Sequence, residues 1–237
     1  MTDLNLWALE GPSGTAIWGY GRYGEDQIMP LSFDDVRHDT AAATSALLAL
    51  GLPEGSVIVL ASTVADTGHF HPVQAAAKEL DLMVCNADAS AMDVDRVEMF
   101  LRLLPVAAVI GVTTPVVEGM LERGHDPRTV FASTPVVVAD GPARLRLAEA
   151  GVDALRFEIL GPVLTFPCRE RNLHYDGRHW RVEGVGGTLH VSGRGRALAL
   201  SSFDTGLRGS VSEAVCPCGR RDPMVRIDPG APDREPS

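Results

Sequence analysis

The stretches Cys168-Arg-Glu-Arg-Asn-Leu-His174 and Cys216-Pro-Cys218-Gly-Arg220 together contain three of the four cysteines of the chain. Thiolate sulfur and imidazole nitrogen are the ligands that Zn²⁺ prefers, and four of them complete a tetrahedral structural site. Each stretch supplies two such ligands, so a metal ion would tie together segments that lie far apart in the sequence. The spacing therefore predicts a structural zinc site formed by Cys168, His174, Cys216 and Cys218.

The same cysteines allow a second interpretation. A free cysteine often behaves as a small buried hydrophobic residue, and Cys-x-Cys is tighter than the usual Cys-x-x-Cys of zinc sites. His179 and His190 alternate with strand residues and are expected at the surface. Either histidine is a reserve zinc ligand if His174 points away.

Composition and charge exclude several classes of protein. The 237 residues allow one large α/β domain, or one domain with an appendage. A formal net charge of −10 leaves no basic face for phosphates, so no nucleic-acid partner is expected. No stretch approaches the roughly 18 apolar residues of a membrane helix, and the N-terminus does not have the pattern of a signal peptide. We expect a cytoplasmic protein with reduced thiols and no membrane partner.

Residues 1–165 predict an α/β core. After a turn-rich segment over residues 1–30, Ser32 caps a helix that Gly51 ends. Short apolar strands then alternate with helices, which is typical of a mostly parallel sheet covered on both faces, a three-layer fold. The predicted strands are 57–61, 82–85, 106–110, 136–139 and 155–160, and the predicted helices are 32–50, 73–80, 94–104, 115–123 and 142–150.

The pattern changes after the core. The segments 180–183, 188–191 and 197–200 alternate apolar and polar residues and are separated by glycines. We therefore predict a smaller antiparallel β appendage over residues 166–227, held to the sheet by the zinc site. Residues 228–237 are polar and rich in proline, which predicts a disordered tail.

Four segments resemble the large N-terminal domain of phenylacetate–coenzyme A ligases, a branch of the adenylate-forming superfamily. Pro12-Ser-Gly-Thr15 is similar to the phosphate loop of that family, and Gly51-Leu-Pro-Glu-Gly-Ser-Val-Ile58 is similar to its Gly-x-x-x-Gly-Asp-x-Val segment. Cys168 with His174 resembles the Glu-Cys…Gly-Leu-His stretch, and Cys216-Pro-Cys-Gly-Arg220 resembles the Cys-x-Cys-Gly-Arg motif. The resemblance implies part of the ligase fold.

The chain departs from the family where the resemblance implies contacts to ATP. Leu160-Gly-Pro-Val-Leu164 stands where the family has a carboxylate for Mg²⁺, and Leu207 stands in place of the aspartate that holds the ribose. The phosphate loop is shortened, and the lid domain with its catalytic lysine has no counterpart; Lys78, the one lysine, is expected on a mid-chain helix. These departures predict a truncated, degenerate member that does not adenylate on its own, so no ATP cofactor is expected.

His69 and His71 are the candidate catalytic residues. They follow a predicted strand and precede a predicted helix, and ligands bind at that carboxyl edge of open α/β sheets. Imidazoles can act as general acids and bases near neutral pH. The structural alternative is that His69 caps the helix or bonds a turn and that His71-Pro72 begins it.

Three functional hypotheses remain open. The first is an auxiliary acyl-binding or partner protein in a biosynthetic pathway. The second is a repurposed enzyme that acts on an acyl or thioester substrate with His69 and His71. The third is one subunit of a split carboxylate–CoA ligase.

A homodimer or a protein partner is expected because removing flanking segments from a ligase-like core exposes apolar faces. Leu4, Leu6, Trp7 and Trp18 are the candidate contact residues. The alternative is that the N-terminal segment folds back over the exposed face and leaves a monomer.

Overall fold

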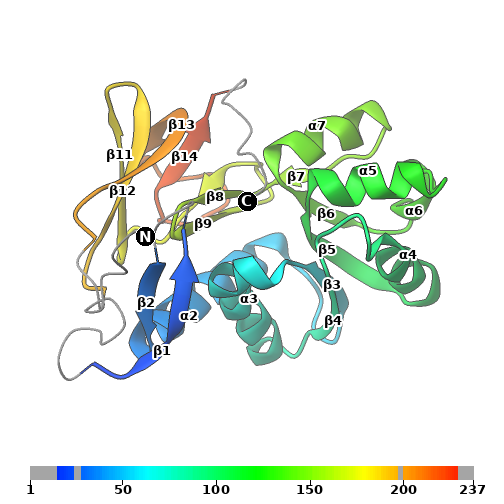
Figure 1. Ribbon diagram of the computed structural model, residues 1–237, viewed down its shortest axis with the longest axis horizontal. Helices are drawn as coiled ribbons and strands as arrows, with labels where there is room; N and C mark the ends of the chain where they lie inside the picture. The colour runs from blue at the N-terminus through cyan, green and yellow to red at the C-terminus, as the bar shows by residue number, and fades with distance from the viewer. Residues whose placement is uncertain (1–14, 24–27, 197–199, 229–237) are drawn as a thin grey trace, which may run out of the picture.

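A parallel sheet forms the centre of the α/β part of the protein (Figure 1). The computed structural model describes residues 15–23, 28–196 and 200–228. The five strands run in the order β4-β3-β5-β6-β7, and each neighbouring pair is parallel. Their bounds are β3 Val57–Ala61, β4 Met83–Ala87, β5 Val106–Val112, β6 Val136–Ala139 and β7 Leu155–Arg156.

Helices cover both faces of this sheet, which confirms the three-layer prediction. α2 and α3 pack against the face that carries Ile58, Leu60 and Ile110. α4, α5 and α7 pack against the opposite face, to which Val59 and Val109 belong. Side chains alternate between the faces because successive residues of a strand point in opposite directions. The helices are α2 Phe33–Leu50, α3 Thr67–Glu79, α4 Val94–Leu103, α5 Thr114–Glu122, α6 Pro127–Val130 and α7 Gly141–Glu149, with a 3₁₀ turn, η1, at Val64–Asp66.

The ends of α2 follow from its sequence. The Ser32 hydroxyl accepts a bond from the Asp35 N–H at 3.0 Å, while the Asp35 carboxylate accepts one from the Ser32 N–H at 2.9 Å. This reciprocal pair is a capping box, which satisfies N–H groups that have no partner inside the helix. At the other end Gly51 takes a left-handed conformation with φ +66°, which glycine adopts without steric cost. The predicted boundaries of this helix are therefore confirmed.

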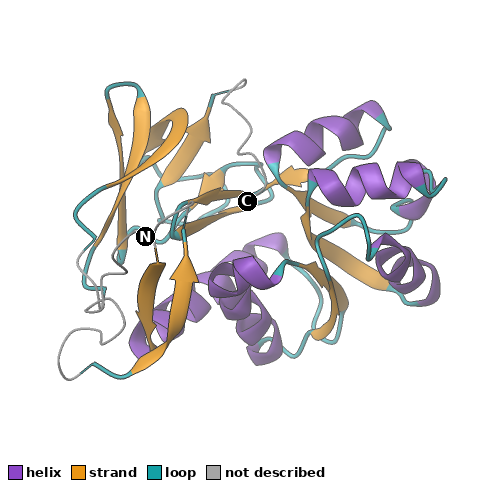
Figure 2. Cartoon of the chain, viewed as in Figure 1, coloured by secondary structure: helices purple, strands orange, loops and turns teal. Residues whose placement is uncertain are grey.

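The second sheet has seven antiparallel strands in the order β11-β12-β13-β14-β10-β9-β8. Figure 2 shows these strands beside the helical part of the protein. Its central strand, β14, pairs with β13 on one side and β10 on the other. Side chains of this sheet form a buried core that includes Trp180, Leu189 and Leu207. The strands are β8 Glu158–Leu160, β9 Val163–Pro167, β10 Leu173–His174, β11 Trp180–Val185, β12 Thr188–Gly193, β13 Phe203–Ser212 and β14 Met224–Ile227. The predicted combination of a parallel sheet with an antiparallel sheet is confirmed.

One predicted strand is wrong. Residues 155–160 form two strands in different sheets, because β7 ends the parallel sheet and β8 begins the antiparallel one. The residue between them, Phe157, donates its N–H to the Ala139 carbonyl at 2.9 Å and buries its ring in the α2–α3 core. The antiparallel sheet therefore begins before residue 166, and the division into a 1–165 core and a 166–227 appendage stays a prediction.

The N-terminal region also differs from its prediction. A hairpin of β1 (Ile17–Arg22) and β2 (Ile28–Ser32) occupies part of the segment expected to consist of turns. Glycines inside β1 lower its strand propensity, so the pattern did not indicate a strand. The predicted segment 197–200 lies largely outside the described residues. The same is true of the tail and of Leu4, Leu6 and Trp7.

Among the described residues, no helix is both long enough and apolar enough to cross a membrane.

Candidate metal centre and adjacent cavity

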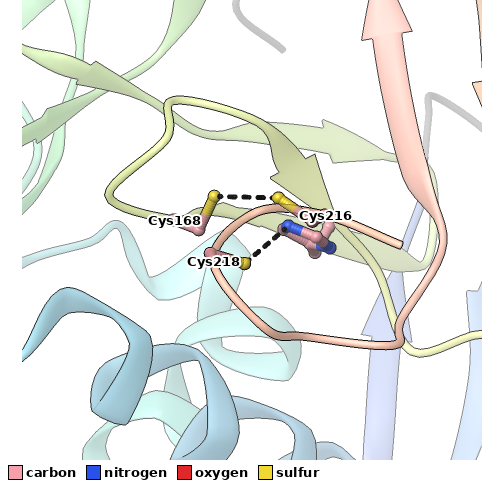
Figure 3. Close-up of side chains that lie close together, drawn as sticks. Cys168, Cys216 and Cys218 are labelled. Carbon is pink, nitrogen blue, oxygen red and sulfur yellow. Dashed lines mark hydrogen bonds between the residues drawn. The ribbon is translucent and has the colours of Figure 1, made fainter. Parts of the chain in front are cut away.

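The four predicted metal ligands come together at one end of the antiparallel sheet. Cys168 follows β9, His174 lies in β10, and Cys216 and Cys218 lie in the loop between β13 and β14. The ligand atoms of all four residues lie within 4.8 Å of one another. Figure 3 shows the sulfurs of Cys168 and Cys216 facing each other from two separate loops, with the Cys218 sulfur directed at a ring nitrogen beside them. This cluster could hold a metal ion, as predicted, and His174 makes the reserve ligands unnecessary.

The spacing of the ligand atoms agrees with a tetrahedral centre. With Zn–S at about 2.3 Å and Zn–N at about 2.05 Å, tetrahedral edges are about 3.8 Å for two sulfurs and about 3.6 Å for sulfur and nitrogen. The Sγ atoms of Cys168 and Cys216 are 3.8 Å apart. Cys218 Sγ lies 3.6 Å from His174 Nε2. Both separations therefore match edges of a tetrahedral zinc site.

Tight turns place the cysteines. Cys168 receives the N–H of Arg171 on its carbonyl at 2.9 Å and donates its own N–H to the Asn172 carbonyl at 3.0 Å. Arg171 has φ +62°, a conformation that non-glycine residues seldom adopt and that surrounding contacts must stabilise. In the second loop the Gly219 N–H bonds the Cys216 carbonyl at 2.9 Å. These turns point the thiols inward.

A second layer of contacts orients the ligands. His174 Nδ1 donates to the Asp222 carbonyl at 2.9 Å, which leaves the Nε2 lone pair directed at the cluster. Asn172 Nδ2 donates to the Cys216 sulfur at 3.3 Å. Such contacts are typical of metal-binding histidines and cysteines, because they fix the ring tautomer and stabilise the thiolate.

Burial changes the acidity of the three ligands with resolved shifts. Burial raises the pKa of the Cys168 thiol to about 11. Burial also acts to raise the pKa of Cys216, but the Cys218 N–H and the Asn172 amide outweigh it, so that pKa is lowered. Burial lowers the pKa of His174, which favours the neutral imidazole that a metal requires.

A cavity of about 60 Å³ adjoins the metal cluster. It lies between α2, α3, β9 and the segment from His174 to Trp180, and both His174 and Arg220 belong to its wall. Small alanines of α2 and apolar residues of α3 and β9 form most of the lining. Its charged members are Asp39, Asp176 and Arg220.

A buried ionic cluster shares Asp39 with the lining of this cavity and was not predicted. The guanidinium of Arg196 bonds both carboxylate oxygens of Asp39, at 2.7 and 2.9 Å, and its Nε lies 3.2 Å from Asp35 Oδ1. The same guanidinium lies 4.4 Å from the ring centroid of Trp180. Only 4% of the Arg196 side chain is exposed. These contacts fasten α2 to the antiparallel sheet.

His69 and His71 are not in the predicted loop. α3 begins at Thr67, so both histidines lie within its first turns, with Pro72 beside them inside the helix. Two residues along a helix correspond to a rotation of about 200°, so the side chains leave the axis in different directions. His69 is buried and donates from Nε2 to the Gly161 carbonyl at 2.8 Å. The ring of His71 lies 4.7 Å from that of Trp18. Their catalytic role stays a prediction.

The positions compared with ATP ligands are apolar and buried. Leu160 and Val163 flank the β8–β9 turn and are 0% and 2% exposed. Leu207 lies in β13 with 8% exposure, inside the core of the antiparallel sheet. Neither position offers a carboxylate to a ligand. Most of the shortened phosphate loop lies outside the described residues.

No protein-family model matches the sequence, and no curated protein matches it. Solved structures do resemble the fold. An open conformation of 2-hydroxyisobutyryl-CoA ligase in complex with 2-HIB-AMP and CoA has a TM-score of 0.66 and 17% identity, covering 90% of this chain and 56% of that one. A postadenylation state of 2-hydroxyisobutyryl-CoA ligase has a TM-score of 0.65 and 17% identity, covering 88% of this chain and 50% of that one.

A malonyl-CoA ligase with methylmalonyl-CoA and AMP bound has a TM-score of 0.55 and 13% identity, covering 89% of this chain and 51% of that one. The chain thus spans about half the length of these ligases. At such identities the likeness concerns the fold alone. The two sheets and their helices have the fold of part of the adenylate-forming acyl-CoA ligases.

Proposed function

We propose that this chain is a ligase-like protein that does not form acyl adenylates and serves as an auxiliary acyl-binding or partner protein. Its cysteine and histidine motifs favour the phenylacetate–CoA ligase branch of the superfamily. The observation that carries the proposal is the burial of Leu207 in the core of the antiparallel sheet. A leucine in that environment can neither accept a hydrogen bond from a ribose nor reach a ligand.

The neighbouring contacts support this proposal. The Thr205 hydroxyl donates to the Leu189 carbonyl at 2.8 Å and accepts the Leu207 N–H at 3.1 Å. The nearest carboxylate in sequence, Asp204, accepts the Gly206 N–H at 2.9 Å. The polar side chains of this segment therefore form hydrogen bonds with backbone groups of the antiparallel sheet. At the β8–β9 turn, Gly161 O accepts the bond from His69, and no acidic residue occupies 160–164.

We assign zinc to the metal cluster and give it a structural role. Three thiolates and one imidazole leave no ligand position for substrate, and closed four-ligand sites of this kind are structural. The two loops belong to strands that flank β14, so the ion would hold β9, β10 and the β13–β14 loop together. The binding free energy of such an ion is also folding free energy.

Adenylation is the activity to test. Calorimetry of the zinc-loaded chain with Mg-ATP should show no binding at micromolar concentrations. Pyrophosphate exchange with aryl, hydroxy and short-chain carboxylic acids should remain at the background of a no-enzyme sample, with an active acyl-CoA ligase as the positive control. Micromolar ATP binding, or exchange that depends on one of the acids, would contradict the proposal.

A second candidate function is one subunit of a split carboxylate–CoA ligase, and the likeness of the fold to acyl-CoA ligases supports it. The match covers 88–90% of this chain but only 50–56% of the length of the 2-hydroxyisobutyryl-CoA ligases. A separate polypeptide would then supply the remaining half. Affinity purification of the tagged chain from its native cells should recover a stoichiometric partner, and the purified pair should exchange pyrophosphate. Recovery of a partner protein whose complex with this chain shows no pyrophosphate exchange would support the auxiliary role instead.

A further inference from the structure

A second cavity, of about 240 Å³, shares no lining residue with the cavity beside the metal cluster. The apolar residues of its lining include Leu50, Val136, Val137 and Leu155. Leu50 ends α2, whereas Val136 and Leu155 are the first residues of β6 and β7. The cavity therefore lies at the amino ends of these strands. Because Leu207 and residues 160–164 are not part of its lining, it does not depend on whether the chain forms adenylates.

Two arginines and one aspartate are the charged members of this lining. Arg169 and Arg171 belong to the loop between Cys168 and His174, and Asp153 precedes β7. Both arginines are exposed, so their guanidinium groups are accessible to a molecule in the cavity. Two cations against one anion leave a net positive charge, although the whole chain has a formal net charge of −10. The cavity therefore favours an anionic ligand.

Arg169 is held by the end of α2. Its Nε donates to the Leu50 carbonyl and its Nη2 to the Gly51 carbonyl, both at 3.3 Å. These carbonyls form the negative end of the helix dipole, and α2 has no basic residue in its own last turn. A Cβ on Gly51 would clash with the guanidinium. In the described chain the partners of Arg169 are thus uncharged carbonyls, and the remaining N–H groups of its guanidinium can donate to a ligand.

Arg171 pairs only at the surface. Its Nη2 contacts Asp153 Oδ2, and the two side chains are 53% and 79% exposed. Ion pairs of this exposure stabilise a fold only weakly, so Arg171 can contact a second anion at little cost. Guanidinium groups bind oxyanions especially well, because several N–H donors lie in one plane. Together the two arginines can hold one oxyanion.

We propose that this cavity binds an organic anion with an apolar body, with its oxyanion at Arg169 and Arg171 and its hydrocarbon part against Leu50, Val136 and Leu155. An apolar lining with a few polar groups that fix orientation is typical of small-molecule sites. One water position needs about 10–15 Å³, so a cavity of about 240 Å³ has room for a molecule of the size of octanoate.

Calorimetry on the full chain tests the ligand class with octanoate, n-octylammonium and acetate. Octanoate should bind saturably. Octylammonium carries the opposite charge and acetate lacks the apolar chain, so each should bind about tenfold more weakly or worse, because the charged hydrogen bonds or the apolar contacts are lost. Absence of octanoate binding overturns the proposal, and so does equal binding of either of the other two probes.

A matched pair of arginine variants tests the location. Arg169→Gln removes a positive charge from the lining and should weaken octanoate binding by about tenfold. Arg221→Gln removes the same charge from an exposed arginine outside the lining and should leave the affinity unchanged. Unchanged binding by Arg169→Gln would show that octanoate binds elsewhere and would overturn the proposal, as would an equal loss of affinity in both variants.

Asp153→Asn tests the charge argument in the opposite direction. It removes the carboxylate that competes for Arg171, so octanoate should bind about threefold more tightly or better. Because Asp153 is 79% exposed, the substitution should change the unfolding midpoint little. Damage to the fold cannot imitate a gain in affinity, which keeps this test decisive if Arg169→Gln disturbs the end of α2. Unchanged or weaker octanoate binding by Asp153→Asn overturns the proposal.

Discussion

The imidazole rings of His38 and His179 stack with their centroids 3.8 Å apart and their planes 15° from parallel. His38 belongs to α2, whereas His179 precedes β11, so the stack joins the helical layer to the antiparallel sheet. His179 Nδ1 lies 2.6 Å from Asp176 Oδ2, and His38 Nδ1 is buried with no hydrogen-bond partner in the described chain. The buried position of this Nδ1, without a partner in the described chain, disfavours a positive charge on the His38 ring.

The stability of the protein should therefore decrease in mild acid. Burial, then His179 and Arg196, lower the pKa of His38 below its ordinary value of about 6.5. The unfolded chain then takes up a proton at a higher pH than the folded chain does. The contribution of His38 is fully present above about pH 6.5 and is lost as the pH falls toward the folded pKa. Denaturant unfolding at pH 8 and pH 5.5 measures this difference.

The matched variants for this test are His38→Gln and His190→Gln. The first should reduce the acid-dependent loss of stability, and the second, which changes a histidine of β12, should retain it. The assignment to His38 fails if both variants keep the pH dependence of the wild type.

Removal of one metal ligand should destabilise the fold. Cys216→Ser should lower the free energy of unfolding by roughly 3–5 kcal/mol and release the metal, because the remaining ligands bind zinc more weakly. Cys85→Ser, which changes the cysteine outside the cluster, is the control. Elemental analysis of protein purified without added metal should give one zinc per chain. Full folding in a strong chelator, with no zinc bound, would exclude a structural metal.

Restoring an acid at position 207 should damage the core without creating a nucleotide site. Leu207→Asp places a carboxylate among the buried residues of the antiparallel sheet and should cost roughly 3–5 kcal/mol of unfolding free energy. Arg208→Asp, on the opposite and exposed face of β13, should cost far less. If Leu207→Asp instead binds Mg-ATP with little loss of stability, position 207 has access to a ligand.

The outer edge of β4 should mediate self-association. No strand of the described chain pairs with that edge, and Met83 is 55% exposed on it. Met83 donates its N–H to the Ser56 carbonyl of the neighbouring segment, so the N–H groups of Val84 and Asn86 point outward. Open edges of this kind pair readily with a second copy. We therefore expect a dimer in sedimentation at micromolar concentration.

Val84→Pro removes one outward N–H while leaving the bonds to β3 in place, and it should give a monomer. Trp7→Ala tests the alternative contact through the N-terminal segment. A wild-type monomer of 25.3 kDa that recovers no partner from native cells would remove the support for a partner role.

Local rules were enough to predict the parallel sheet and α2. The Ser32 cap, the Gly51 end and the short apolar strands depend on neighbouring residues, and each appears in the structure. α3 was misplaced because Pro72 suggested a helix start, whereas the helix begins at Thr67 and contains Pro72 in its interior, where proline is unusual. The switch of sheets at Phe157 depends on a bond to Ala139, which no local pattern reveals.

The metal cluster could be predicted because its residue types are rare and chemically specific. The cavity beside it and the ionic cluster that shares Asp39 with this cavity could not, since Arg196 and Asp39 are 157 residues apart and their pairing depends on how α2 lies against the antiparallel sheet. Charged residues are common, so their types and spacing alone identify no pair.

The central strand of the antiparallel sheet is also the last of its strands to leave the ribosome. β14 follows β8–β13 in the sequence but lies between β10 and β13 in the sheet. Until residues 224–227 emerge, the sheet consists of two separate pieces, β8–β10 and β11–β13, each with an open edge at β10 or β13. A nascent chain that stalls just before β14 therefore presents the unpaired edges of β10 and β13 to other chains, so it needs chaperone protection until residues 224–227 emerge.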